Sequence, residues 1–332
     1  MEHPLATLRC FAMRSWLVFA VACTPAKPYV PDAPKIEFPI QQIVEDELQH
    51  AIDDWKPEAA FAIVLREGDI VAVAGWEDGK TDAKIPLTRT YVTGSTLKSF
   101  TIAIALDETA IKDTDSFDCA PRTYPGSELR DVQPHDDLLS VKDILINSSN
   151  VGASRIEDKI GLAKFEDGLK RFHFGMPPAP FPDPIAAGTQ AEGLFAAGEL
   201  YAATPLQVAR AYEALFHDGY YEGPEGRNEA VSRETALLVQ DMLAEAVKSG
   251  TGEEAKIKGH RVIGKTGTAV YSAERVYASF VGAVMEGSPQ TIFVGIVGPS
   301  TGGTGPSAAA PVFARIAERT LRLDRKRGDD DD

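Results

Sequence analysis

The sequence predicts an α+β fold: one mostly antiparallel, five-stranded sheet, flanked by N- and C-terminal helices, with a large all-helical insert. Strand-like apolar runs occur early in the chain, at 61–65 and 70–73, and return near its end, at 260–270, 276–285 and 290–297. The long stretch between these two groups carries helix-start signals instead. Helical spacing of apolar residues appears before the first group and after the second.

The first predicted helix covers about residues 43–54, where Ile43, Val44, Leu48 and Ile52 recur at helical spacing. The two strand-like runs that follow it are joined by residues 66–69, which include a glycine. This pattern predicts a β-hairpin.

The insert is predicted at about residues 95–250. Its clearest helix start is Thr204, an N-cap residue followed by Pro205 at the first helical position and by Gln207 three residues after the cap. Ser140 and Ser232 are expected to cap two further helices, which run to about residues 146 and 247.

The last helix is predicted at about 309–323. It follows the glycine-rich loop 302–305, which we interpret as a connector and not as a phosphate-binding loop. The simplest arrangement places the two terminal helices on one face of the sheet and the insert on the other. A reaction site is then expected between the sheet and the insert.

The composition excludes several kinds of partner. The 332 residues are 44% hydrophobic and 25% charged, as in globular proteins, and their net charge is −15 without a Lys/Arg-rich run. Nucleic acid is therefore not an expected partner. The three cysteines form no CxxC and the six histidines no HxxxH or HExxH, so we expect no disulfide framework, no metal site and no cofactor.

The N-terminus resembles an export signal. Arg9 and Arg14 precede the apolar run 16–22, which is far shorter than the roughly 20 residues that span a bilayer. Small residues before Cys23 are typical of a bacterial lipoprotein, so we expect lipid on Cys23 and membrane contact through that anchor alone. A plain secretory signal, an unprocessed N-terminal helix and a start at Met13 remain open alternatives.

The chain is accordingly divided into four segments. They are an export signal (1–23), a Pro-rich extended tether (24–39), one catalytic-type domain (40–325) and an acidic tail (326–332).

Ser95 and Lys98 form an S-x-x-K motif at the start of an apolar helix. Residues three apart on a helix share a face, so the lysine amine can reach the serine hydroxyl. A serine is a poor nucleophile until a base takes its proton, and a desolvated lysine can be that base. The helix N-terminus also favours developing negative charge at this point.

Two further short motifs accompany it. Ser148 and Asn150 form S-x-N just after a predicted helix end, and Lys265-Thr266-Gly267-Thr268 lies in a strand-like segment. A glycine in a strand can permit close approach of a ligand.

In this order the three motifs resemble those of penicillin-binding proteins and serine β-lactamases. The chain is most similar to the transpeptidase domain of class B penicillin-binding proteins. The similarity extends over about 37–325 and includes five blocks, GSTLKSF (94–100), SSNVG (148–152), TPLQ (204–207), GKTGTA (264–269) and APVF (310–313). It implies the fold described above.

The resemblance also implies the catalytic roles. Ser95 would be the acylated nucleophile, Lys98 its general base, and Ser148 a proton shuttle toward the leaving amine. Lys265 would add positive potential near Ser148, and the backbone amides of Ser95 and Thr268 would form the oxyanion hole.

The implied activity is that of a D,D-transpeptidase acting on D-Ala-D-Ala stem peptides of peptidoglycan, with β-lactams as covalent inhibitors. Asn150 would bind the substrate backbone, Thr266 and Thr268 would bind its carboxylate, and Gly267 would allow close approach. Transfer to water instead of an amine, as in a D,D-carboxypeptidase or a serine β-lactamase, is the alternative.

The sequence departs from the family pattern at several points. Thr93 and Ser99 stand where the family commonly has proline, and the segment 76–94 is shorter than usual. The family's membrane helix and N-terminal pedestal are not recognisable, so we do not predict a role in the division or elongation machinery.

Residues 259–266 also satisfy G-x-x-x-x-G-K-T, the phosphate loop of nucleotide hydrolases. That loop must open a helix, whereas β-favouring residues follow Gly267, so we reject this interpretation. A class A β-lactamase would need a water-activating Glu after Ser148, and the nearest segment, at Glu192, lacks the accompanying Asn. A sensor domain and a non-catalytic binding protein are also disfavoured.

Overall fold

The computed structural model describes residues 33–125, 129–177, 198, 200–224, 226–272, 275–300 and 302–330. The predicted export signal, Met13, Cys23 and most of the predicted tether lie outside these residues, as does Glu192. No helix within the described ranges is both long enough and apolar enough to cross a bilayer.

Helix α1 (Phe38–Trp55) begins earlier than the sequence predicts. Pro39 occupies its first turn, where the missing N–H costs nothing, so the last two residues of the predicted tether are helical. The face with Ile40, Val44 and Leu48 is buried against the sheet. The helix ends at Lys56, which adopts the left-handed conformation.

The central sheet has six strands in the order β10-β11-β12-β1-β2-β3, and all neighbours are antiparallel. Five of them are the predicted strands: β1 (Ala59–Arg66), β2 (Asp69–Glu77), β10 (Val262–Ser272), β11 (Arg275–Val284) and β12 (Thr291–Val297). The sixth, β3 (Lys80–Thr81), corrects the predicted count. It has two exposed residues, so it leaves no apolar pattern in the sequence.

Strands from the two ends of the chain meet at the middle of this sheet. β1 pairs with β12 from Ala59 opposite Val297 to Leu65 opposite Thr291. Successive β1 side chains enter two cores: Phe61, Ile63 and Leu65 face the insert, whereas the residues between them face the terminal helices. Burial on both faces explains why the strand is a nearly continuous apolar run.

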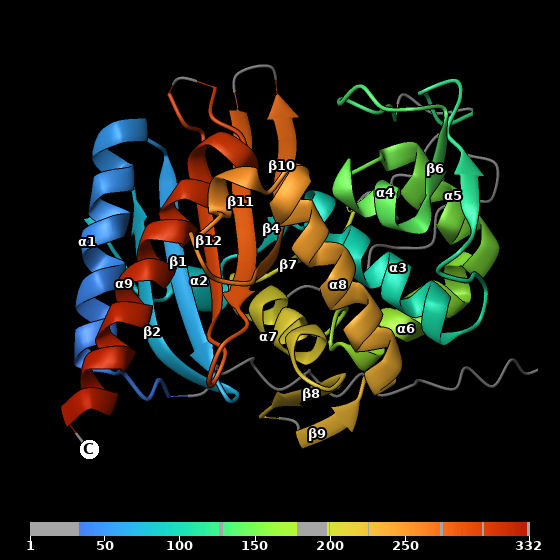
Figure 1. The fold of residues 1–332 in the computed structure, drawn as a ribbon. Coiled ribbons are helices and arrows are strands. Elements are labelled where there is room, and N and C mark those ends of the chain that lie inside the picture. Colours follow the sequence, from blue (N-terminus) through green and yellow to red (C-terminus); the bar gives the residue numbers. More distant parts are fainter. Residues whose placement is uncertain are drawn as a thin grey trace, which may run out of the picture.

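Helix α9 (Ala310–Asp330) lies beside α1 on one face of the sheet (Figure 1). The buried Glu47 of α1 accepts hydrogen bonds from Arg315 (2.6 Å) and Arg319 (2.9 Å) of α9. The helix continues to Asp330, so most of the predicted acidic tail is part of α9.

The insert lies on the other face of the sheet, and six helices form most of it. These are α3 (Lys98–Asp107), α4 (Val141–Ile146), α5 (Asn150–Ile160), α6 (Leu162–Arg171), α7 (Pro205–Phe216) and α8 (Arg233–Ser249). The predicted caps are confirmed: Ser140 and Ser232 accept backbone N–H groups, and Thr204 and Gln207 form a reciprocal capping box.

The insert is not all-helical, which corrects the prediction. Three small antiparallel pairs lie within or beside it, namely β4 (Tyr91–Val92) with β7 (Ala202–Ala203), β5 (Ser116–Asp118) with β6 (Leu138–Ser140), and β8 (Tyr220–Gly223) with β9 (Gly226–Glu229). Strands of two to four residues are too short to show the alternation by which strands are recognised.

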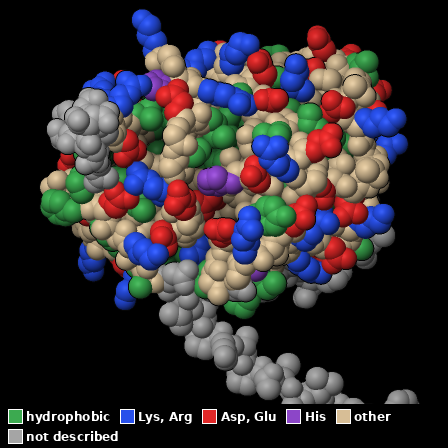
Figure 2. All heavy atoms as spheres, turned by 60° about the horizontal axis from the view of Figure 1, so that its bottom comes forward, with side chains coloured by type: hydrophobic (Ala, Val, Ile, Leu, Met, Phe, Trp, Pro, Cys, Tyr) green, Lys and Arg blue, Asp and Glu red, His purple; other side chains and the backbone are tan. Residues whose placement is uncertain are grey.

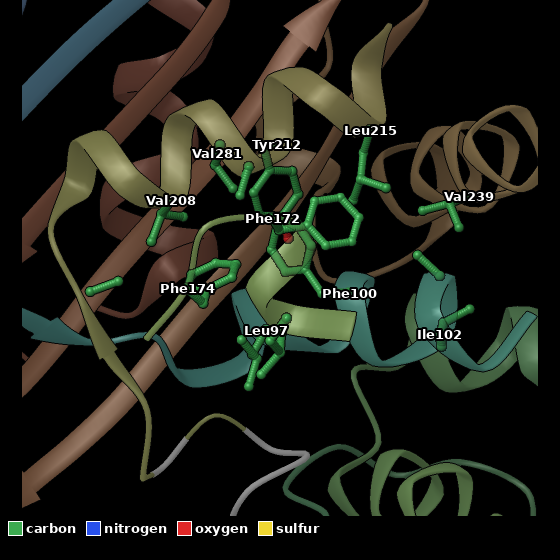
Figure 3. Close-up of a cluster of buried hydrophobic side chains, with 14 of the residues drawn as sticks. Leu97, Phe100, Ile102, Phe172, Phe174, Val208, Tyr212, Leu215, Val239 and Val281 are labelled. Atoms are coloured by element: carbon green, nitrogen blue, oxygen red, sulfur yellow. The ribbon is translucent and has the colours of Figure 1, made fainter. Parts of the chain in front are cut away.

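An aromatic cluster holds α3 within the insert. The ring of Phe100 makes edge contacts with Phe172, Phe174 and Tyr212, at centroid distances of 4.9 to 5.0 Å. Figure 3 shows these rings between α7 and the start of α3, with Leu97 just below them. Burial of each such ring contributes about 2 kcal/mol, so the cluster fixes the start of α3.

Charged side chains are interspersed on the face shown in Figure 2, where neither sign forms a continuous patch. That face offers no basic surface for nucleic acid.

Candidate active site

Ser95 lies in the 3-10 turn η1 (Gly94–Leu97), which leads directly into α3. Gly94 has φ +53°, and a Cβ at this position would face Thr268 and Ala269 of β10 at ordinary contact distances. The backbone conformation is what requires glycine, because a side chain would be strained at this φ. Ser95 itself is only half-buried, which leaves its hydroxyl accessible.

Lys98 is fully buried and its amine is the centre of the site. Nζ donates to Ser95 Oγ at 2.9 Å, to the carbonyl oxygen of Ser148 at 2.6 Å, and to the side-chain oxygen of Asn150. Ser148 Oγ lies 3.3 Å away. The structure therefore places the predicted base next to the predicted nucleophile.

Ser148 lies in the short connection between α4 and α5, with φ +57°. This left-handed conformation is costly for a non-glycine residue and is often found at functional sites. It places the Ser148 hydroxyl between two amines, since Lys265 Nζ donates to Ser148 Oγ at 2.9 Å.

Lys265 projects from β10 and is buried. Removal from water, and secondarily the nearby charge of Lys98, hold the pKa of Lys265 well below its usual range. The amine also donates to the carbonyl oxygen of Thr266 at 3.2 Å. Lys265 can thus exchange a proton with Ser148 more readily than an exposed lysine could.

The remaining residues of the β10 motif differ in accessibility. Thr266 is buried, and its hydroxyl lies 2.8 Å from that of Thr251. Thr268 is half-buried, and its Oγ1 accepts the N–H of Gly305 at 3.0 Å. Thr268 is therefore better placed than Thr266 to meet a ligand.

Close packing of β10 requires glycine at position 267. A Cβ at this position would lie 2.3 Å from Ser279 Oγ on β11 and 3.0 Å from Thr96 Cγ2 on η1. Protein atoms fill that space, so glycine is needed for packing β10 between these two elements.

Sequence reasoning missed the residues that hold Asn150 in place. The Asn150 side-chain amide donates to the carbonyl oxygen of Arg130 at 2.7 Å, and its backbone N–H donates to the carboxylate of Asp131. Asp131 belongs to no motif and is distant in sequence, so only the folded chain reveals the contact.

Among the described residues, no group of three or more His, Cys, Asp or Glu is placed to hold a metal ion.

Known proteins share this arrangement of sequence and fold. The family model described as "Penicillin binding protein transpeptidase domain" matches residues 59–318, which include every element of the site. The chain belongs to this transpeptidase family.

The transpeptidase domain is 26% identical to the probable peptidoglycan D,D-transpeptidase PbpC of Pseudomonas aeruginosa, over 86% of this chain and 58% of the relative. It is 25% identical to the peptidoglycan D,D-transpeptidase FtsI of Escherichia coli, over 85% of this chain and 54% of the relative. The chain thus spans little more than half the length of these curated relatives.

A solved structure confirms the class of the transpeptidase fold. The transpeptidase domain of Burkholderia pseudomallei penicillin-binding protein 3 has a TM-score of 0.76 and 26% identity, covering 88% of this chain and 96% of that one.

Lys265 and Thr266 lie inside β10, which is followed by another strand, so rejection of the nucleotide-hydrolase interpretation is confirmed.

Proposed function

We propose that this chain is a penicillin-binding acyl-serine enzyme, a D,D-transpeptidase that acts on D-Ala-D-Ala stem peptides of peptidoglycan. The observation that carries the proposal is the convergence of Ser95, Ser148 and Asn150 on the buried amine of Lys98. Membership in the transpeptidase family and the printed activities of the relatives support it.

In the first step, Ser95 Oγ attacks the carbonyl carbon of the D-Ala-D-Ala peptide bond while its proton passes to Lys98 Nζ, 2.9 Å away. The amides of Ser95 and Thr268 are the proposed donors to the oxygen that becomes negative. For this, Lys98 must be neutral when the substrate arrives. After it has taken the proton, Lys98 Nζ can donate hydrogen bonds to the carbonyl oxygen of Ser148 and the side-chain oxygen of Asn150, which are both uncharged.

In the second part of this step, the C–N bond breaks and the departing D-Ala amine needs a proton. Ser148 Oγ lies 3.3 Å from Lys98 Nζ and 2.9 Å from Lys265 Nζ. A proton taken by Lys98 can therefore reach the leaving amine through Ser148. Lys265 holds the shuttle hydroxyl in place and stabilises it as it loses the proton.

The resulting acyl ester on Ser95 is then attacked by an amine of a neighbouring stem peptide, which forms a crosslink and returns the proton to Ser95. Attack by water instead would give D,D-carboxypeptidase or, with a β-lactam, β-lactamase activity. Lys98 and Lys265 donate to hydroxyl, carbonyl and amide oxygens, and these contacts supply no carboxylate that could activate water. We therefore expect a long-lived penicilloyl adduct.

Export belongs to the same proposal, because peptidoglycan lies outside the cytoplasm. The apolar run before Cys23 is consistent with an export signal, and lipid on Cys23 would hold the domain at the membrane surface. The reaction requires no cofactor. Retention of Cys23→Ala with the membrane fraction would contradict lipid anchoring.

The deciding experiment is intact-mass spectrometry over time after addition of one equivalent of penicillin. The proposal expects one added penicillin mass that persists for many minutes in the wild type and is absent in Ser95→Ala. Rapid loss of the mass with hydrolysed drug accumulating would identify a β-lactamase. Undiminished labelling of Ser95→Ala would place the nucleophile elsewhere.

A further inference from the structure

Asp131 closes the first turn of α5 from outside the helix. Its side chain is 1% exposed, and Oδ1 accepts the backbone N–H groups of Asn150 and Val151. Oδ2 accepts the hydroxyl of Ser149 at 2.8 Å, and Ser149 Oγ in turn accepts the N–H of Gly152. All three free N–H groups at the start of α5 are thereby satisfied.

The same segment also orients the Asn150 side chain. Arg130, the neighbour of Asp131, accepts the Asn150 side-chain N–H at 2.7 Å through its carbonyl oxygen. Because the amide nitrogen is directed to this carbonyl, the amide oxygen must face the other way, where it meets Lys98 Nζ. Residues 130 and 131 thus fix both the backbone and the side chain of Asn150.

His135 holds Asp131 in turn. Its side chain is also 1% exposed, with Nε2 2.7 Å from Asp131 Oδ2 and Nδ1 2.7 Å from the carbonyl oxygen of Asp136. A carbonyl oxygen can only accept, so Nδ1 carries a proton. Nε2 faces the carboxylate of Asp131, so the ring bridges this carboxylate and the Asp136 carbonyl oxygen within the loop.

We propose that Asp131 and His135 are positioning residues for acylation. This inference rests on the acyl-serine function proposed above. They set the start of α5 so that the carbonyl oxygen of Ser148 and the side-chain oxygen of Asn150 both meet the amine of Lys98. Neither residue touches the reacting atoms. They act through Asn150 and Ser148, and through these on the base.

An ordinary helix cap does not require this construction. Ser149 is itself an N-cap residue and satisfies Gly152 without help. The additional carboxylate comes from a different segment, and it binds the residue whose side chain contacts the base. The backbone of that segment is itself tied down, since Asp131 N–H donates to the carbonyl oxygen of Arg122 at 3.0 Å.

Two pairs of variants separate geometry from charge. Asp131→Ala removes every contact, whereas Asp131→Asn keeps an oxygen for the two backbone N–H groups and offers an amide N–H to Ser149 and to His135. His135→Leu removes the polar partner of Asp131, whereas His135→Gln keeps one. Glu47→Ala is the stability control, because it removes a buried carboxylate between α1 and α9 on the opposite face of the sheet.

The measurement is the acylation rate of each purified variant at saturating fluorescent penicillin, beside its melting temperature. We expect Asp131→Ala to acylate about 10- to 100-fold more slowly than the wild type, because displacement of a catalytic group by about 1 Å costs up to about 100-fold. Asp131→Asn should stay within about threefold of the wild type, since its geometry is retained. His135→Leu should be slow and His135→Gln nearly normal.

Equal slowing by Asp131→Asn and Asp131→Ala would overturn the positioning role, because the charge would then be what matters. If acylation by Glu47→Ala also slows in proportion to its loss of melting temperature, then lost stability alone slows the reaction, and the positioning role is overturned too. If Asp131→Ala does not fold, the two His135 variants decide, and equal rates for them contradict the proposal. A wild type that penicillin does not label defeats the proposed function itself, which is a distinct result.

Discussion

The hydroxyl of Tyr212 donates a hydrogen bond of 2.6 Å to the carbonyl oxygen of Thr96, the residue that follows Ser95. The same hydroxyl lies 2.8 Å from Ser99 Oγ, and Tyr212 is fully buried, so burial raises the pKa of its phenol. Figure 3 shows the tyrosine reaching from α7 toward the start of α3. The turn that carries the proposed nucleophile is therefore tied to a helix more than a hundred residues away in sequence.

Tyr212→Phe leaves the Thr96 carbonyl and the Ser99 hydroxyl without this partner in a dry environment. We expect the free energy of unfolding to fall by about 1–3 kcal/mol in urea denaturation. The double variant with Ser99→Ala should lose less than the sum of the two single variants, because the two hydroxyls share one interaction. Additive losses would show that the hydroxyls act independently.

Lys98→Ala removes the amine that lies 2.9 Å from Ser95 Oγ. Acylation by penicillin should slow by about 10² to 10⁴-fold, the usual contribution of a general base. Stopped-flow fluorescence with a labelled penicillin measures it. A near-normal rate would transfer the role of base to another residue, with Ser148 the first to test.

Lys265→Met should make the protein more stable at neutral pH while slowing acylation by about 100-fold, a typical loss for one catalytic donor. The pKa of Lys265 is lowered in the folded state, so the unfolded state binds more protons between that value and about 10.4. The contribution of Lys265 to the free energy of unfolding of the wild type should therefore rise with pH across this window.

The check is chemical denaturation of both proteins at several alkaline pH values. The stability advantage of Lys265→Met should shrink as the pH approaches the ordinary lysine pKa. A constant difference between the two proteins would mean that Lys265 is not desolvated as the structure indicates.

Gly267→Ala tests the packing of β10. The new methyl group would meet Ser279 Oγ and Thr96 Cγ2, so we expect a loss of about 1–3 kcal/mol, as for other overpacked sites. Within the described residues Ser279 Oγ has no hydrogen-bond partner, so Ser279→Ala should itself cost little. The double variant should recover part of the loss, and no recovery would place the strain against η1 instead.

The sequence predicts what depends on local spacing. The S-x-x-K pair shares a helix face, and the caps at Ser140, Thr204 and Ser232 were expected from residue type alone. Membership in the transpeptidase family, predicted from the ordered motifs, is confirmed. The approach of Lys265 to the Ser148 hydroxyl was expected only from the resemblance, since no local rule joins residues so far apart.

Other features follow from contacts that no pattern encodes. Thr93 and Ser99 looked like unexplained departures from a family pattern with proline at these positions. In the structure the Thr93 N–H donates to the carbonyl oxygen of Tyr201 at 2.8 Å, a bond that proline cannot make. Ser99 pairs with Tyr212. The role of Asp131 and the two-residue strand β3 were not predicted, because both depend on contacts that exist only in the folded chain.

The pairing of β1 with β12 has a consequence for how this protein matures. The first long strand of the sheet finds its neighbour only near the end of the chain, at Thr291–Val297, so the central contact is of very long range. Such pairing cannot form until residues 291–297 have left the ribosome. A nascent chain would already carry Ser95 and Lys98 yet lack β10 and Lys265, so the proposed nucleophile and base would meet Lys265 only after the last strands have been synthesised.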